Sequence, residues 1–99
     1  MIIGTLKLKI HIPWARSLKE KRMVVKSICA KVRVKFNVSI AEVEEQDIYK
    51  TVVLGISYVT TDNAQADSIA DNVINFIESS TEGDIIMISR NKSISNCWE

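Results

Sequence analysis

Residues 3–12 alternate between apolar and polar side chains, and this pattern constrains the fold more than any other part of the sequence. The apolar face of the predicted strand carries Leu6, Leu8, Ile10 and Ile12. The polar face carries Thr5, Lys7, Lys9 and His11. Such alternation is typical of an antiparallel strand with one buried and one solvated face. Pro13 ends the strand, because proline cannot donate a backbone hydrogen bond to a sheet.

Five further elements follow in the sequence. Ser17 and Glu20 have the spacing of a capping box, which predicts a helix from Ser17 to about residue 35. Residues 38–44 predict a strand whose phase slips between Ile40 and Val43, so we expect a bulge or an early strand end there. The most apolar strand is expected at residues 50–59, a second capped helix at 62–79, and a last strand at 85–89.

The predicted order is therefore β-α-β-β-α-β. At this length the order favours an α+β ferredoxin-like fold, in which two helices cover one face of a four-stranded antiparallel sheet. The 99 residues are expected to form one domain, with residues 91–99 as a tail or an extension of the edge strand.

Composition narrows the classes of protein to consider. The longest apolar runs fall well short of a membrane span, and lysines interrupt the N-terminal segment where a signal peptide would be apolar. A cytoplasmic location is expected. Cys29 and Cys97 have no metal-binding spacing, and we expect them to be ordinary thiols.

Charge is segregated along the chain. Residues 1–35 contain ten of the thirteen Lys and Arg residues and a single acid, Glu20, whereas residues 36–99 contain eleven of the twelve acids. On a helical wheel, one flank of the first helix carries Lys19, Arg22, Lys26 and Arg33, and Arg16 precedes the helix. The opposite flank carries Lys21, Lys31 and Lys35. These bases could be a solvated edge, a surface for structured RNA, or a surface for an acidic protein.

A row of apolar residues lies opposite the predicted core stripe of the same helix: Met23, Ala30 and Val34. Such residues can be scattered surface apolars. They can also be the dry centre of a homodimer interface whose rim joins a basic flank of one copy to an acidic flank of the other. The open face of the sheet is a second surface through which copies could pair.

The sequence offers little for catalysis. It contains no nucleophile–base pair, metal cluster or phosphate-binding loop, so we expect neither enzymatic activity, a cofactor, a metal nor a small-molecule substrate. The acidic residues Glu42, Glu44, Glu45 and Asp47 alternate along a strand without a loop to wrap a cation. We expect them to be a solvated edge or an electrostatic mate for the basic helix of a second copy.

The predicted open sheet face bears on the mode of RNA binding. RNA-recognition motifs stack bases on aromatic side chains of the two central strands. No aromatic residue occurs among the open-face positions of residues 5–11 or of residues 53–59. RNA would therefore be bound through charge and shape, with low sequence specificity and strong salt dependence.

Three segments resemble the YlxP-like family of small bacterial proteins, a domain of unknown function. The first is Pro13 with residues 15–22 (ARSLKEKR), the second is residues 36–43 (FNVSIAEV) with Gln46-Asp47, and the third is residues 53–55 (VLG). Trp14 stands where that family often has a small residue. The resemblance implies a ferredoxin-like fold. Members are typically encoded beside translation and ribosome-maturation factors, which favours RNA or ribosome association.

We therefore expect a non-enzymatic cytoplasmic domain that binds structured RNA or a ribosomal surface through Arg16, Lys19, Arg22, Lys26 and Arg33. The alternative is an interaction or assembly module whose basic helix meets an acidic protein or a second copy of the chain. A homodimer is expected in either case.

Overall fold

The computed structural model describes residues 1–95 and shows six elements along the chain. The strands are β1 (Ile2–His11), β2 (Ser39–Glu44), β3 (Thr51–Thr60) and β4 (Asp84–Ile94), and the helices are α1 (Leu18–Lys35) and α2 (Asn63–Ser80). The antiparallel sheet has the order β2-β3-β1-β4. This is the ferredoxin-like βαββαβ arrangement that the sequence predicts.

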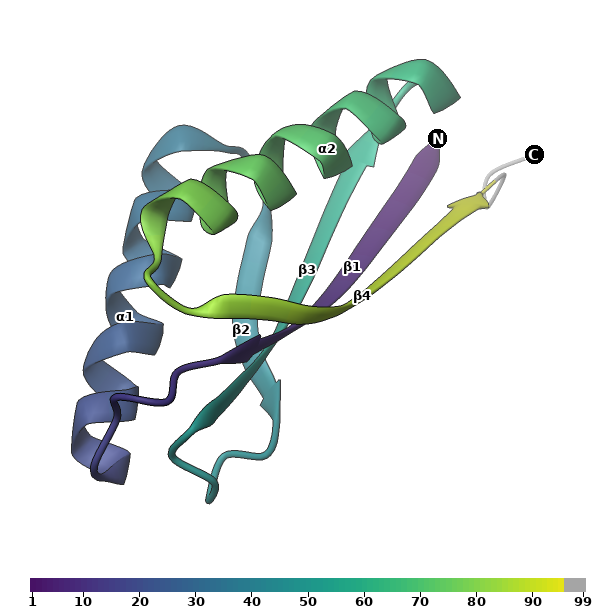
Figure 1. Cartoon of the computed structure of the whole chain (residues 1–99). Coiled ribbons are helices and arrows are strands. Elements are labelled where there is room, and N and C mark those ends of the chain that lie inside the picture. Colours follow the sequence, from purple (N-terminus) through teal and green to yellow (C-terminus); the bar gives the residue numbers. More distant parts are fainter. Residues whose placement is uncertain (96–99) are drawn as a thin grey trace.

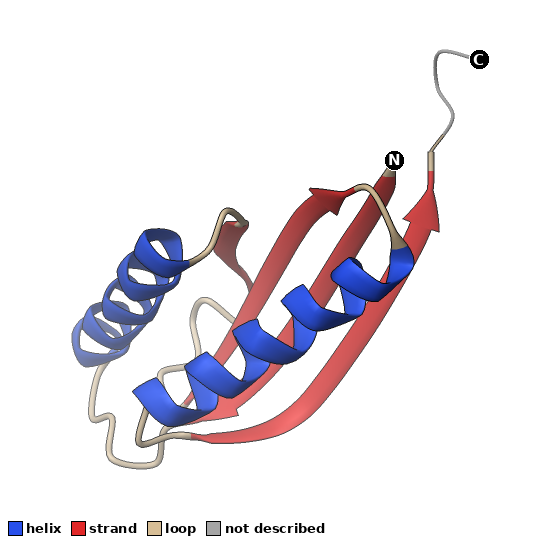
Figure 2. Ribbon diagram, turned by 90° about the horizontal axis from the view of Figure 1, so that it is seen from above, coloured by secondary structure: helices blue, strands red, loops and turns tan. Residues whose placement is uncertain are grey.

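Both helices cover the same face of the sheet, and the other face is open (Figure 1, Figure 2). The molecule is elongated, with principal extents of 50 × 23 × 22 Å. Neither helix is long and apolar enough to cross a bilayer within the described residues.

The core lies between the sheet and the helices and follows the alternation in β1. Leu6, Leu8 and Ile10 are buried, whereas Thr5 and Lys7 on the open face are exposed. Buried residues of β3 and of the two helices complete the core: Val52, Leu54, Ile56, Tyr58, Ile28, Val32, Val73 and Ile77. The ends of the helices meet through Phe36 and Phe76, whose rings lie edge to face at 5.6 Å.

The edge strands differ from each other and, in one case, from expectation. β2 carries the expected bulge, since its pairing with β3 shifts between Glu42 and Glu44 and leaves Val43 as the extra residue. The predicted strand at residues 85–89 is shorter than β4, which continues to Ile94; of the two alternatives for the following residues, the extension of the edge strand is found up to Ile94. Residues 89–93 have weak strand propensity. They are nevertheless part of the strand, because β4 pairs with β1 along its full length, as far as Ile94 opposite Ile2. Residues 96–99 lie outside the described part of the chain.

A buried lysine ties α1 to the connection between β2 and β3. Lys21 is only 1% exposed, and its Nζ donates to the carbonyls of Glu45 at 2.6 Å and Ile48 at 2.5 Å. The same ammonium lies 2.8 Å from Glu42 Oε2. Two carbonyls therefore accept hydrogen bonds from the ammonium, and the Glu42 carboxylate is its counter-ion. The helical-wheel placement of Lys21 on a solvated flank is wrong, because the side chain turns inward to these acceptors.

A second lysine ties the same connection to the turn before α1. Lys50 Nζ donates to the carbonyl of Pro13 at 2.7 Å, and the Ile12 amide donates to the Lys50 carbonyl at 2.8 Å. Glu45 has a φ of 56°, an uncommon conformation for a residue with a side chain. The loop at residues 45–50 is therefore held between α1 and the turn by two lysines that reach in opposite directions.

We expect Lys21→Met to lower the free energy of unfolding by about 3 kcal/mol, because it leaves the Glu42 carboxylate without its counter-ion in a largely buried site. Lys31→Met is the matched control on the exposed surface of the same helix and should change stability by less than about 0.5 kcal/mol. Adding Glu42→Gln to Lys21→Met should recover part of the loss. Urea unfolding of the four proteins measures this, and equal losses for Lys21→Met and Lys31→Met would contradict the role of the buried ammonium.

Gly4 is required by the ring of Tyr58 on the neighbouring strand. A Cβ atom at Gly4 would lie 2.2 Å from Tyr58 Cε2, and the Tyr58 hydroxyl is held by the Ala66 carbonyl at 3.2 Å. Gly4→Ala is therefore expected to cost about 2 kcal/mol of stability through overpacking. Gly55→Ala meets only the exposed Val43 side chain at 2.7 Å, which can turn away, so its cost should be smaller. Thermal unfolding compares the two variants, and the reverse order would exclude this explanation.

Candidate nucleic-acid interface

Local interactions at its first turn fix the start of α1. The Ser17 hydroxyl accepts from the Glu20 amide at 3.2 Å, and Glu20 Oε2 accepts from the Arg16 amide at 2.9 Å. This is the predicted capping arrangement. The only acid of the N-terminal third is thus turned back toward the start of the helix, where it also complements the positive end of the helix dipole.

A basic ridge follows one flank of α1. Its members are Arg16, Lys19, Arg22, Lys26 and Arg33, all of which are exposed. Arg33 donates to the carbonyl of Ile40 in β2 at 2.8 Å, so this flank lies beside the β2 edge of the sheet. Within residues 1–95 none of the five makes an ion pair. The basic ridge therefore carries uncompensated positive charge.

Three of the four acids expected to be solvated or to face a second copy are instead paired with lysines of the same chain. Glu42 pairs with Lys21, Glu44 with Lys7, and Glu45 with Lys9. Lys7 and Lys9 come from the open face of β1, and Lys21 comes from the core side of α1. No group of three or more His, Cys, Asp or Glu side chains in the described residues is placed to hold a metal ion.

Pairing on α2 and β4 uses two more acids. Asp71 lies 2.6 Å from Arg90, and Asp67 lies 2.9 Å from Lys92. The charges of β4 are therefore compensated by the neighbouring helix, in contrast to those of the basic ridge.

The opposite flank of α1 differs from the basic ridge. Lys21 is buried, and Lys35 lies over the ring of Phe76 at 4.7 Å from its centroid. Lys31 is exposed. The sequence analysis missed the structural role of Lys21, although its spacing with Val25, Ile28 and Val32 is that of the core stripe. That spacing is the signal that could have identified it.

The outer row of α1 faces solvent in the monomer. Met23 is 66% exposed and Val34 is 90% exposed, and Ala30 lies between them. Its function as an interface stays a prediction. The acids Glu42, Glu44 and Glu45, which were expected to supply the acidic rim of such an interface, are engaged within their own chain.

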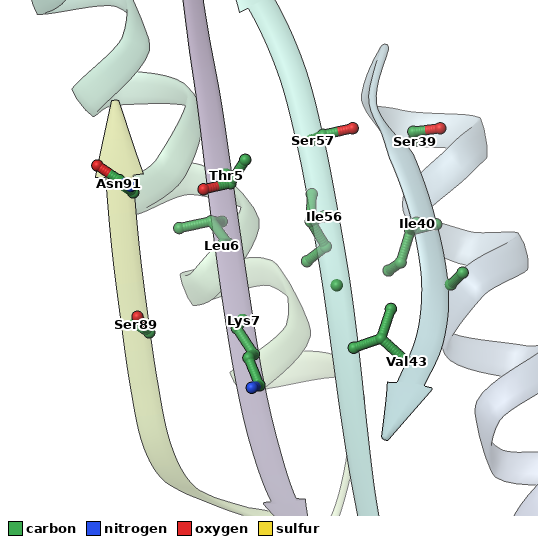
Figure 3. Close-up of a pocket in the computed structure, with 12 residues that line it drawn as sticks. Thr5, Leu6, Lys7, Ser39, Ile40, Val43, Ile56, Ser57, Ser89 and Asn91 are labelled. Carbon is green, nitrogen blue, oxygen red and sulfur yellow. The ribbon is translucent and has the colours of Figure 1, made fainter. Parts of the chain in front are cut away.

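The open face of the sheet is hollowed over its centre, where a depression of about 550 Å³ crosses all four strands. Figure 3 views this face with the helices behind the sheet. The depression is lined mainly by small and polar side chains: Thr5, Lys7, Ser39, Ala41, Val43, Ser57, Ser89 and Asn91. None of its lining residues is aromatic. This face therefore lacks the stacking platform that RNA-recognition motifs use.

The other residues considered from the sequence carry no evident chemistry. His11 is half-buried at the end of β1, and Trp14 is partly exposed in the turn before α1. Cys29 is buried in the core, and burial raises the pKa of its thiol above the ordinary value, which disfavours the reactive thiolate. Cys97 lies outside the described residues.

Solved structures with similar backbones share the fold. A de novo designed protein with a ferredoxin fold, solved by solution NMR, matches all of this chain and 93% of its own, with a TM-score of 0.58 and 20% identity. The de novo designed protein Foldit4 matches 96% of this chain and 98% of its own, with a TM-score of 0.50 and 10% identity. At these identities the similarity shows the ferredoxin-like fold and nothing of function.

Sequence comparison gives a closer relationship. The model of a family described as "Protein of unknown function (DUF503)" matches residues 3–90. The uncharacterized protein YlxP of Bacillus subtilis (strain 168) is 40% identical over 81 residues, which cover 82% of this chain and 88% of that protein. The chain therefore belongs to the YlxP-like family of proteins of unknown function.

Proposed function

We propose that this protein is a non-enzymatic, cytoplasmic RNA-binding domain that contacts structured RNA, such as a ribosomal surface, through the basic ridge of α1. The observation that carries the proposal is the distribution of ion pairs. Five acids of the chain are paired with bases outside the basic ridge, while the ridge itself has no acidic partner in residues 1–95. An uncompensated, exposed row of bases attracts a polyanion.

The dimensions of the basic ridge suit a phosphate backbone. From Lys19 to Arg33 the helix rises about 21 Å, at about 1.5 Å per residue. A surface of that length can contact several successive phosphates of one nucleic-acid strand. Arg22 and Lys26 lie one turn apart on the same flank, near the middle of this length.

Contacts to phosphates carry little sequence information, and the open face offers no aromatic side chain to stack bases within its depression. We therefore infer recognition by charge and shape. A folded RNA that presents closely spaced phosphates is favoured over a flexible single strand, because one continuous helix holds most of these bases at regular spacings.

The second candidate is a protein partner with an acidic surface. The same uncompensated charge supports it. In a second copy of this chain, Glu42, Glu44 and Glu45 are a poor source of that acidic surface, because they already pair with lysines of their own chain. The protein alternative therefore needs an acidic surface other than these three residues.

Charge reversal on the basic ridge tests the proposal. Arg22→Glu with Lys26→Glu should weaken binding to a structured RNA at least tenfold and make the plot of log affinity against log salt concentration shallower by about 2, since each phosphate contact contributes about 0.9 to that slope. The matched control is Lys31→Glu with Lys35→Glu, which makes the same change in net charge on the other flank. Fluorescence anisotropy at several salt concentrations measures both, with circular dichroism to verify folding.

The control shows whether RNA binding depends on the basic ridge or only on the net charge of the protein. If both pairs of substitutions weaken binding equally, net charge alone is responsible and the basic ridge is not the site. If the unmodified protein binds with no salt dependence, phosphate contacts do not supply the affinity.

Affinity capture from a cell extract separates the two candidates. We expect nuclease treatment to release the captured partners, because RNA connects them to the protein. Partners that stay bound after nuclease treatment, and that are lost with Arg22→Glu and Lys26→Glu, would establish the acidic-protein alternative instead.

A further inference from the structure

The two edges of the sheet are protected to different degrees. β2 is six residues long, is interrupted by the bulge at Val43, and has its Ile40 carbonyl bonded to Arg33 of α1. β4 is eleven residues long and pairs only with β1 within the described residues. Short length, bulges and covering elements are devices that prevent a strand edge from pairing with another chain. β2 has all three, whereas β4 has one bulge near its start and a long regular segment after it.

The helix-facing side of β4 also lacks a cover. Ile88 and Ile94 lie opposite Leu8 and Ile2 of β1, so they face the layer of helices. Ile88 is 49% exposed and Ile94 is 66% exposed, whereas Leu8 and Ile2 are buried. The helices therefore stop short of the β4 edge, which lies at the free margin of the sheet in both views (Figure 1, Figure 2).

The two basic side chains of β4, Arg90 and Lys92, point away from the free edge and toward α2. Arg90 forms an ion pair with Asp71 and also donates to the Asp67 carbonyl at 3.3 Å. Lys92 forms an ion pair with the Asp67 carboxylate, so both basic side chains contact α2. Free lysines on an edge strand discourage pairing with another strand. Here the two positive charges are paired with aspartates of α2, so they oppose the approach of another strand less than free lysines would.

We propose that β4 is a dimerisation edge that pairs antiparallel with β4 of a second copy and continues the sheet across a two-fold axis. An antiparallel strand pair is self-complementary, as a two-fold interface requires. The second copy would supply the missing cover for Ile88 and Ile94 and would bond the backbone groups that β4 directs away from β1.

The sequence of β4 selects a register for this pair. Opposed residues must face the same side of the sheet, and the bulge at Ile86 leaves residues 87–94 as the regular segment. A two-fold axis at Asn91 places Ile88 of one copy opposite Ile94 of the other. An axis at Arg90 would instead place Ile88 opposite Lys92 and Ile94 opposite the bulge residue Ile86, so the two isoleucines would not pair with each other. In the Asn91 register Arg90 faces Lys92 of the other copy, but each retains its own aspartate.

This interface leaves the basic ridge free. α1 lies beside β2 at the opposite margin of the sheet from β4 (Figure 1). A dimer through Met23, Ala30 and Val34 would instead bring two basic helices together, and Glu42, Glu44 and Glu45 are already paired within their own chains. The location on β4 is therefore favoured over the outer row of α1.

Sedimentation at micromolar concentration tests the interface. The unmodified protein should sediment at twice the monomer mass, and Ile88→Lys with Ile94→Lys should return it to the monomer mass with its circular dichroism unchanged. The control, Met23→Lys with Val34→Lys, should stay dimeric. A strictly monomeric unmodified protein would overturn the proposal, as would a dimer that only the α1 substitutions dissociate or that neither pair affects.

Cysteine cross-linking tests the register without loss of folding. In a Cys97→Ser background, Asn91→Cys lies on the proposed axis, so an oxidant should convert most of it to a disulfide-linked dimer. Ser89→Cys on the same face of β4 lies about 13 Å from its symmetry mate in this register, beyond the roughly 7 Å that a disulfide allows. Equal linkage of both variants, or linkage of Ser89→Cys alone, would exclude the Asn91 register. Linkage of neither would exclude the β4 pair.

Discussion

The buried ammonium of Lys21 is the interaction on which the arrangement of charge in this protein depends. Its three oxygen partners come from β2 and from the loop that follows it, so α1 can pack on the sheet only with that loop drawn against its first turns. The cost of burying a charge is offset when the charge is hydrogen-bonded and paired. Here two backbone carbonyls accept from the ammonium and a carboxylate neutralises it. Lys50 reinforces the same junction from the other side.

This junction also determines which bases are available for binding. Glu42 is committed to Lys21, and the neighbouring acids Glu44 and Glu45 point to the open face of the sheet, where Lys7 and Lys9 neutralise them. The acids of β2 therefore turn away from the basic ridge, although β2 and the ridge are adjacent. A chain with almost no net charge thus presents one helix flank of a single sign.

The elements and their order could be predicted because local rules and tertiary packing agree for most of the chain. The alternation in β1, the caps at Ser17 and Asp62, and the phase slip before Val43 each have a local physical cause that is visible in the sequence. The sequence left the length of β4 open between a tail and an extension of the edge strand, since pairing with β1 rather than local propensity extends it. Lys21 was assigned to a solvated flank because of its charge, although its helical spacing matches the core stripe. Its acceptors come from residues more than twenty positions away. The exposed basic flank of α1 could be predicted from helical spacing. The partners of the acids could not be predicted, because their ion pairs form only in the folded chain.

The two proposed surfaces lie at opposite margins of one sheet, and this separation has a consequence for affinity. Pairing through β4 would place two basic ridges at the far ends of a continuous eight-stranded sheet, on the same helical side. Two ridges in one dimer can bind one long RNA together, and the second contact is then intramolecular.

The apparent affinity for a long folded RNA should therefore fall when the dimer is dissociated by Ile88→Lys with Ile94→Lys. The affinity for an RNA too short to reach both ridges should not change. Titration of a long and a short RNA against the dimeric and monomeric proteins separates the effect of assembly from the effect of the ridge itself. An equal loss for both lengths would mean that the substitutions damage the ridge rather than the link between its two copies.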